Sequence, residues 1–166
     1  MVHKLGHYGF MSTNYEETYD WYSTVLNLEL VDVLNDPEDQ SIDLARFYRL
    51  SLGNEYVDHH CMILTREKKG GTRVHHSSFE VEDFDTQLIG HDWLKERDYQ
   101  LFWGVGRHVH GSQVFDYWKD TSGYVVEHYA DGDVVNDETP VTKGKFGNGS
   151  IWGPRVPDFG PKHEGK

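Results

Sequence analysis

The chain of 166 residues is 37% hydrophobic and 14% aromatic, which is enough apolar material for the core of one domain and excludes a globally disordered protein. Its 28 acidic residues outnumber the 16 basic ones and give a net charge of -12, which argues against nucleic acid as a partner because like charges repel. No apolar run approaches the roughly 20 residues that cross a bilayer, so no membrane partner is expected, and the single cysteine, Cys61, excludes an internal disulfide and fits a cytoplasmic location.

The first half of the chain predicts one strand, one helix and three further strands. A strand is expected over residues 4–11, and a capping box in "TNYE" (Thr13–Glu16) then opens a helix. The three further strands are expected at Leu28–Leu34, Ile42–Leu52 and Tyr56–Leu64. A polar segment with two adjacent glycines, residues 65–72, predicts a linker after them.

The second half repeats this order. "RVHHSSFEV" (Arg73–Val81) predicts a strand, and Asp83–Arg97 predicts a helix with Leu88 and Trp93 towards the core. Three strands are then expected at Tyr99–Gly104, Ser112–Trp118 and Tyr124–Ala130. Both halves therefore read as β-α-β-β-β, which predicts a duplicated α+β module.

Four polar residues fall at matching places in the two halves. His7 and His76 lie on the two first strands, while His60 and Glu127 lie on the two fourth strands at nearly the same spacing. If the modules pack around a two-fold axis, His7, His76 and Glu127 meet in one cavity. Two imidazoles and a carboxylate form the facial triad typical of non-haem Fe(II), although zinc and nickel also accept imidazole. Because side chains alternate along a strand, His76 is expected to face this site and His75 to face away.

The remaining histidines leave alternatives open. His60 is expected to point into the cavity, either as a fourth ligand or as an acid/base beside the metal, with His59 on the opposite face. "GVGRHVHGSQ" (Gly104–Gln113) predicts a loop at the lip of the site, whose cationic residues either bind an anionic substrate or are simply solvated; they are Arg107, His108 and His110. Four others are interpreted as surface or supporting residues, namely His3, His91, His128 and His163.

Five segments carry a resemblance to a known family: "LGHYGF", "HHCMIL", "RVHHSSFEV", "GRHVHGSQVFDYW" and "DTSGYVVEHY". In order and spacing they are similar to the catalytic half of a type I extradiol catechol dioxygenase, in the vicinal oxygen chelate (glyoxalase–bleomycin resistance–dioxygenase) superfamily. The resemblance implies a cup-shaped, partly open mixed β-barrel over residues 1–131. This domain is expected to contain module one at 3–66 and module two at 73–131, with residues 132–166 as a tail packed on it.

The resemblance also implies a chemistry. It makes His7, His76 and Glu127 the ligands of Fe(II), a set that Mn(II) accepts as well. The family's acid/base histidine matches His60, and two residues that contact substrate oxygens match His108 and Tyr117. The implied reaction is extradiol cleavage of a small aromatic diol with O2. Because the chain starts only six residues before His7, it is either a single-domain enzyme or a fragment, and a homo-oligomer is expected to cover its first strand.

Two alternatives keep the same fold. A glyoxalase-like isomerase or epimerase tends to use four protein ligands, with a carboxylate or amide where this chain has His60. A non-catalytic protein that binds a small molecule such as a drug can lack a complete metal triad. The histidine at position 60, together with His108 and Tyr117, favours the oxygenase.

Overall fold

The computed structural model describes residues 2–147 and 149–159, in which one strand-and-helix pattern occurs twice. The first copy consists of β1 (Val2–Ser12), α1 (Tyr15–Val25), β2 (Leu28–Asn35), β3 (Asp43–Leu50), β4 (Val57–Asp58) and β5 (Met62–Arg66). The second consists of β6 (Arg73–Val81), α2 (Phe84–Lys95), β7 (Leu101–His108), β8 (Val114–Lys119) and β9 (Val125–Ala130). Three short strands follow, namely β10 (Val134–Val135), β11 (Thr142–Lys145) and β12 (Ser150–Trp152). The predicted α+β duplication is confirmed, while His163 lies outside the described residues.

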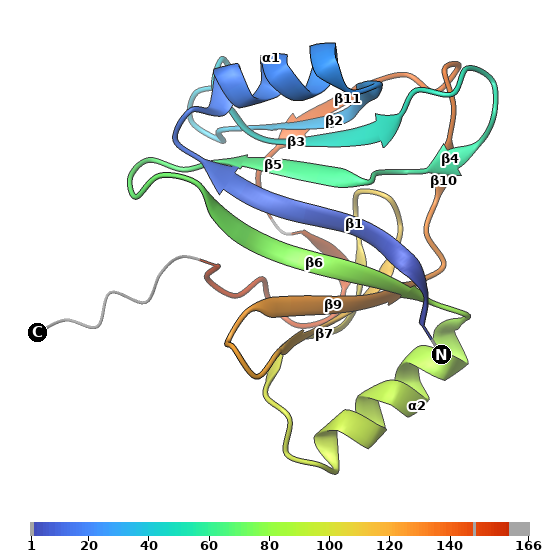
Figure 1. Cartoon of the computed structure of the whole chain (residues 1–166). Helices are drawn as coiled ribbons and strands as arrows, with labels where there is room; N and C mark the ends of the chain where they lie inside the picture. The colour runs from blue at the N-terminus through green and yellow to red at the C-terminus, as the bar shows by residue number, and fades with distance from the viewer. Residues whose placement is uncertain (1, 148, 160–166) are drawn as a thin grey trace, which may run out of the picture.

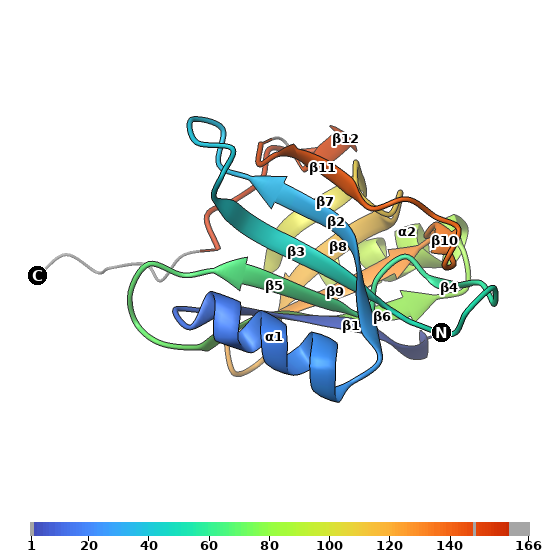
Figure 2. The same ribbon diagram turned by 90° about the horizontal axis from the view of Figure 1, so that it is seen from above.

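The two copies share one ten-stranded sheet in the order β11-β2-β3-β5-β1-β6-β9-β8-β7-β12. Within each copy the first strand runs parallel to the last, β1 to β5 and β6 to β9, and the copies join through the antiparallel pair β1 and β6. The sheet curves so that β2 and β3 lie across from β7 and β8, with the two helices outside it at opposite ends (Figures 1 and 2). This is the cup that the sequence predicts.

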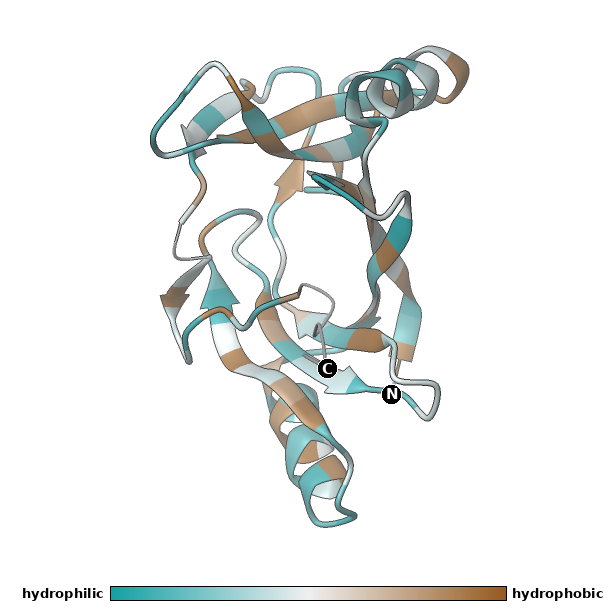
Figure 3. Cartoon of the chain, turned by 90° about the vertical axis from the view of Figure 1, so that its left-hand side faces the viewer, coloured by the Kyte–Doolittle hydropathy of each residue, from teal (hydrophilic) through white to brown (hydrophobic). Residues whose placement is uncertain are grey.

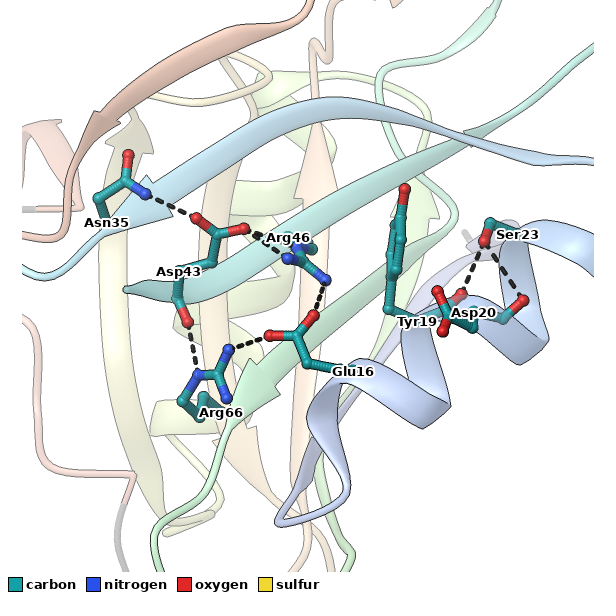
Figure 4. Close-up of polar contacts among 8 residues, drawn as sticks. All are labelled: Glu16, Tyr19, Asp20, Ser23, Asn35, Asp43, Arg46 and Arg66. Carbon is teal, nitrogen blue, oxygen red and sulfur yellow. Dashed lines mark hydrogen bonds and ion pairs between the residues drawn. The ribbon is translucent and has the colours of Figure 1, made fainter. Parts of the chain in front are cut away.

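Helix α1 is fastened to the sheet by both apolar and charged contacts. Its Tyr15 is 1% exposed and belongs to a core cluster with residues of β3 and β5. Glu16 reaches between Arg46 of β3 and Arg66 of β5, as Figure 4 shows, and accepts hydrogen bonds from both. The predicted capping box is wrong. The N-cap is Asn14, whose side chain makes no cap hydrogen bond. The Glu16 carboxylate bonds to the two arginines instead of to the N-cap backbone.

Helix α2 packs on the strands of the second copy through residues other than those that the sequence predicts. Its N-cap, Asp83, accepts a hydrogen bond from the Thr86 amide at 2.7 Å. Leu88 and Trp93, expected in the core, are 38% and 49% exposed, whereas Gln87 is buried and donates to the backbone oxygen of a β9 residue. In Figure 3, α2 lies on the outside of the sheet and has apolar residues among its polar ones. In the described part of the chain, neither helix is long and apolar enough to cross a membrane.

Two predicted element boundaries near the site are wrong. The strand expected over Tyr56–Leu64 is interrupted at residues 59–61, because β4 pairs with β10 and β5 begins only at Met62. Alternation does not hold across this break, so His59 and His60 are both buried rather than on opposite faces. The expected lip loop is also shorter, since β7 continues through His108 and pairs with β8.

The segment after β9 extends the sheet at both edges. β11 pairs with β2 in parallel, and β12 pairs with β7 in an antiparallel manner. Further along, Phe159 stacks on the His75 ring, with 4.1 Å between the ring centroids. The division of the chain into two modules and a tail stays a prediction, and the part of that tail beyond residue 159 lies outside the described residues.

A glycine beside the site should not tolerate a side chain. A Cβ atom on Gly6 of β1 would overlap the ring and hydroxyl of Tyr129, which is 2% exposed and packs against His7. We expect Gly6→Ala to lower the free energy of unfolding in urea by about 1–3 kcal/mol, the usual cost of overpacking. Gly144→Ala in β11 is the control, because its Cβ would make an ordinary contact with Leu34. Equal stability of the two variants would contradict the prediction.

Candidate metal centre

Three buried side chains converge from three adjacent strands of the sheet. They are His7 of β1, His76 of β6 and Glu127 of β9, and their ligand atoms all lie within 4.8 Å of one another. The Nε2 atom of His7 lies 3.0 Å from Nε2 of His76 and 3.0 Å from Oε2 of Glu127. The structure therefore brings together the three predicted ligands; that they bind a metal stays a prediction.

Small neighbours make room for this convergence. Gly9 of β1 pairs with His76, and a Cβ on Gly9 would press on the His76 ring at 3.2 Å. Ser78 of β6 pairs with both His7 and Glu127 and is itself fully buried. The strands thus hold the three candidate ligands on one face without larger side chains between them.

The donor set fits a cation. Both carboxylate oxygens of Glu127 and the Nδ1 atom of His7 are buried without a well-directed hydrogen-bond partner among the described residues. A buried carboxylate needs a compensating positive charge, and a metal ion supplies one. Two ligands at right angles on bonds of about 2.1 Å stand roughly 3.0 Å apart, which agrees with the 3.0 Å between the two Nε2 atoms.

The surroundings keep Glu127 and His7 in the deprotonated forms that can bind a metal. Burial alone would raise the pKa of Glu127, but its contacts with His108, His7 and His76 outweigh burial and hold this pKa well below its ordinary value. Burial lowers the pKa of His7. At neutral pH the site therefore presents a carboxylate and a neutral His7 imidazole, and metal ligands must be deprotonated.

His60 lies beside the three candidate ligands rather than among them. Its ring centroid is 4.3 Å from that of His7, and it is 2% exposed. The prediction that His60 is the counterpart of Glu127 in the first copy is wrong. Gly9 of β1 is equivalent to Ser78 of β6. Because Gly9 pairs with Ile63 and Ser78 pairs with Glu127, the counterpart of Glu127 is Ile63. Burial lowers the pKa of His60 well below its ordinary value, which makes the ring neutral at pH 7. Its position favours the acid/base alternative over a fourth ligand.

His108 and Tyr117 form a hydrogen-bonded pair on the other side of the centre. The Nδ1 atom of His108 lies 3.1 Å from the Gly149 carbonyl oxygen, which can only accept, so Nδ1 carries a hydrogen. Its Nε2 atom lies 3.0 Å from the Tyr117 hydroxyl oxygen and 3.4 Å from Oε1 of Glu127. Burial and the charge of Glu127 raise the pKa of Tyr117 well above its ordinary value, so its hydroxyl stays protonated.

A cavity opens over these groups and receives side chains from both copies. His7, His60, His76, His108 and Tyr117 all line it. Apolar residues form much of the remaining wall, including Leu34, Phe47, Ile63, Phe146, Val156 and Phe159.

His75 does not face away from the site as expected. It lines the cavity, and its Nδ1 atom lies 2.5 Å from Nδ1 of His76. The pairing of β1 with β6 is irregular between Gly9 and Phe10, opposite this point, and Phe159 covers the ring from the other side. Strand alternation alone therefore misplaced this side chain.

The other loop and surface residues take different places. Arg107 donates to the Ser112 carbonyl and to Asp131 rather than to the cavity. His110 lines the cavity. Among the histidines interpreted as surface or supporting residues, His3 is half exposed, and His91 contacts the buried carboxylate of Asp116 at 3.1 Å.

A second buried carboxylate near the cavity was missed from the sequence. Asp32 of β2 is 3% exposed and lies 2.8 Å from Nδ1 of His110 and 3.3 Å from Nε2 of His59. Thr142 donates to its other oxygen. The signal that could have found it is the one that marks Glu127, a carboxylate within an apolar strand, since Asp32 interrupts "LELVDVL".

Asp32 should make stability depend on acid pH. Burial alone would raise its pKa, but contacts with His110, His59 and Thr142 outweigh burial and hold it well below its ordinary value. In the unfolded chain the Asp32 carboxyl takes up its proton near pH 4, whereas in the folded protein it stays ionised to a lower pH. The stabilisation that Asp32 provides is therefore complete above about pH 5 and is lost as the pH falls through 4. We expect Asp32→Asn to cost about 3 kcal/mol at pH 7 and progressively less towards pH 3 in urea unfolding.

The control for this measurement is Asp92→Asn, which changes an exposed carboxylate of α2. We expect no comparable loss of stability for that variant. A deficit of Asp32→Asn that does not change between pH 7 and pH 3 would contradict the electrostatic explanation.

Comparison with known proteins places the chain in a family context. A family model described as the Glyoxalase/Bleomycin resistance protein/Dioxygenase superfamily matches residues 4–128. Metapyrocatechase 2 of Cupriavidus necator is 30% identical over 159 residues, which are 94% of this chain and 46% of that protein.

Two solved structures have a similar fold. The 2,3-dioxygenase LapB from Pseudomonas sp. KL28 has a TM-score of 0.74 at 22% identity, over 86% of this chain and 48% of that one. Homoprotocatechuate 2,3-dioxygenase from Brevibacterium fuscum, in complex with 3,4-dihydroxyphenylacetate, has a TM-score of 0.77 at 20% identity, over 95% of this chain and 49% of that one. The chain thus spans about half the length of the relatives it matches.

Proposed function

Because the chain belongs to the glyoxalase/bleomycin resistance protein/dioxygenase superfamily, we propose that it is a metal-dependent extradiol dioxygenase that cleaves the ring of a catechol-type diol with O2. The observation that carries the proposal is the convergence of three buried donors beside a cavity that His60, His108 and Tyr117 also line or flank. The names of the relatives, a metapyrocatechase and several 2,3-dioxygenases, support the same chemistry.

In this proposal His7, His76 and Glu127 hold Fe(II), and Mn(II) suits the same donors. When bound, the metal supplies positive charge that favours loss of a diol proton, together with open positions for both reactants. The strands supply rigidity, because each ligand comes from the sheet itself. Holding the diol and O2 in contact makes their encounter effectively intramolecular.

The protein groups around the centre orient the substrate and move its proton. Tyr117, kept protonated, and His108 stand beside the substrate oxygens, and the hydrogen bond between them fixes both side chains in place. His60 is neutral, so its free nitrogen takes a proton as the diol ionises and returns it as the ring opens. The apolar wall of the cavity keeps bulk water from these groups.

Reconstitution with Fe(II) tests the proposed function. The purified protein is loaded without oxygen, then given air-saturated buffer and a panel of catechols. We expect one O2 consumed per diol and a yellow semialdehyde-type product. Turnover of a hemithioacetal in place of catechols would contradict it in favour of an isomerase, and tight binding of a diol without O2 uptake would contradict it in favour of a binding protein. Self-association and a cytoplasmic location stay predictions.

A further inference from the structure

Three side chains form a line that ends at the cavity. Asp32 lies on β2, and its Oδ2 atom is 3.3 Å from Nε2 of His59. The Nδ1 atom of His59 is in turn 3.0 Å from Nδ1 of His60. His60 lines the cavity, whereas His59 lies behind it and does not. All three are buried, with at most 6% of each residue exposed.

The direction of each hydrogen bond follows from the first group. The low pKa of Asp32 keeps its carboxylate ionised, so it can only accept, and it takes the Nε2 hydrogen of His59. With that hydrogen on Nε2, the Nδ1 atom of His59 is left to accept, and the hydrogen in its contact with His60 comes from Nδ1 of His60. The lone pair of the His60 ring is then on Nε2. Among the described residues, the hydrogen bond of the His60 ring is the one that Nδ1 makes with His59, which leaves Nε2 available to the cavity.

The surroundings of His59 hold its ring in this orientation. Its backbone amide donates to the Asp133 carbonyl at 3.0 Å. Gly111 lies against the ring so closely that a Cβ there would be 2.9 Å from Nδ1. On the other side of the line, the Asp32 carboxylate is itself fixed by His110 and Thr142. The ring of His59 therefore cannot turn freely to exchange its two nitrogens.

We propose that Asp32 and His59 are positioning residues that fix His60 in the tautomer with a bare Nε2 towards the cavity. The inference rests on the proposed function for its catalytic meaning, because the bare Nε2 is the atom that accepts the diol proton: the substrate O–H bond breaks and an N–H bond forms. Neither Asp32 nor His59 needs to touch the substrate. Partners of this kind, one contact away from a catalytic group, typically change activity by about 10–100-fold.

The tautomers can be read directly in the metal-free protein. Two-bond 1H–15N correlation spectra of uniformly 15N-labelled protein at pH 7.5 distinguish a hydrogen on Nδ1 from one on Nε2, with the rings assigned from His59→Asn and His60→Gln. We expect His59 to carry its hydrogen on Nε2 and His60 to carry its hydrogen on Nδ1. A His60 protonated on Nε2 in the wild-type protein would overturn the inference.

Two substitutions of nearly equal size separate positioning from packing. His59→Leu fills the space but offers no acceptor to His60, whereas His59→Asn offers its Oδ1 near the place of Nδ1. In the Fe(II)-loaded protein we expect His59→Leu to lower kcat by about 10–100-fold with KM and metal content little changed. We expect His59→Asn to retain most of kcat. If packing alone mattered, the apolar Leu would serve a buried site at least as well as Asn, and that result would overturn the inference.

Thr142→Val is the matched control, because it removes another partner of Asp32 and leaves the His59 contact in place. We expect this variant to keep the wild-type His60 tautomer, and a change there equal to that of His59→Leu would overturn the inference. If the wild-type protein cleaves no catechol, the proposed function fails while the tautomer measurement still decides the inference. If it does cleave catechols and both His59 variants match it, the inference fails alone.

Discussion

Glutamine in place of Glu127 should abolish the stabilisation of the protein by Mn(II) or Fe(II) and should also lower the stability of the metal-free fold. The carboxylate is fully buried, and its contacts with His108, His7 and His76 hold its pKa well below its ordinary value, so the folded state favours the ionised form. A neutral amide weakens those contacts, and it also removes the anionic ligand.

Thermal unfolding with and without Mn(II) measures both effects. At a metal concentration of 100 times Kd, the wild-type protein should gain about 2.7 kcal/mol, or roughly 5–10 °C in Tm for a domain of this size. Glu127→Gln should gain nothing. Glu80→Gln on β6 is the control, because that carboxylate faces Lys4 and lies outside the centre. Wild-type metal affinity in Glu127→Gln would rule Glu127 out as a ligand.

Replacing His60 by glutamine should leave the metal in place and slow turnover by about 10²–10⁴-fold, the usual contribution of an acid/base group. The expectation follows from its position, beside His7 but outside the group of three candidate ligands. Glutamine keeps a polar side chain of similar reach, yet it cannot take up and return a proton at neutral pH.

Metal analysis and steady-state kinetics on one preparation distinguish the two possible roles of His60, metal ligand and acid/base group. Loss of metal together with activity would make His60 a ligand, and unchanged turnover would remove it from the mechanism. His128→Gln is the control: this half-buried histidine follows Glu127 on β9, where its backbone oxygen contacts Gln87 of α2, and it does not line the cavity. We expect that variant to keep both metal and activity.

The sequence was sufficient for the duplicated fold because its local patterns agree with the final packing. The strand predicted over Arg73–Val81 has the observed bounds, and from His76 to Phe79 buried residues alternate with partly exposed ones, as on a sheet with one face inward. Once two such strands meet at the middle of one sheet, His7 and His76 must approach each other. The convergence of the three candidate ligands could therefore be predicted from position in the repeat.

What the sequence missed depends on contacts between distant segments. The break at residues 59–61 exists because β4 pairs with β10, far along the chain, and nothing in "YVDHHCMIL" marks it. That break turns both His59 and His60 inward, and without it the contact between Asp32 and His59 has no explanation. The strands β11 and β12 were missed for the same reason, because such short segments become strands only by pairing with an existing edge.

The antiparallel pair β1 and β6 is the seam where the two halves of the molecule are joined, and each strand of the seam brings one candidate ligand. An ion bound there would cross-link the two halves. Opening the seam would then require its release, so amide hydrogen exchange along these two strands should slow when metal is added and should report occupancy without any substrate. An isolated half would lack at least one of the three candidate ligands, so the site requires both copies of the duplicated module.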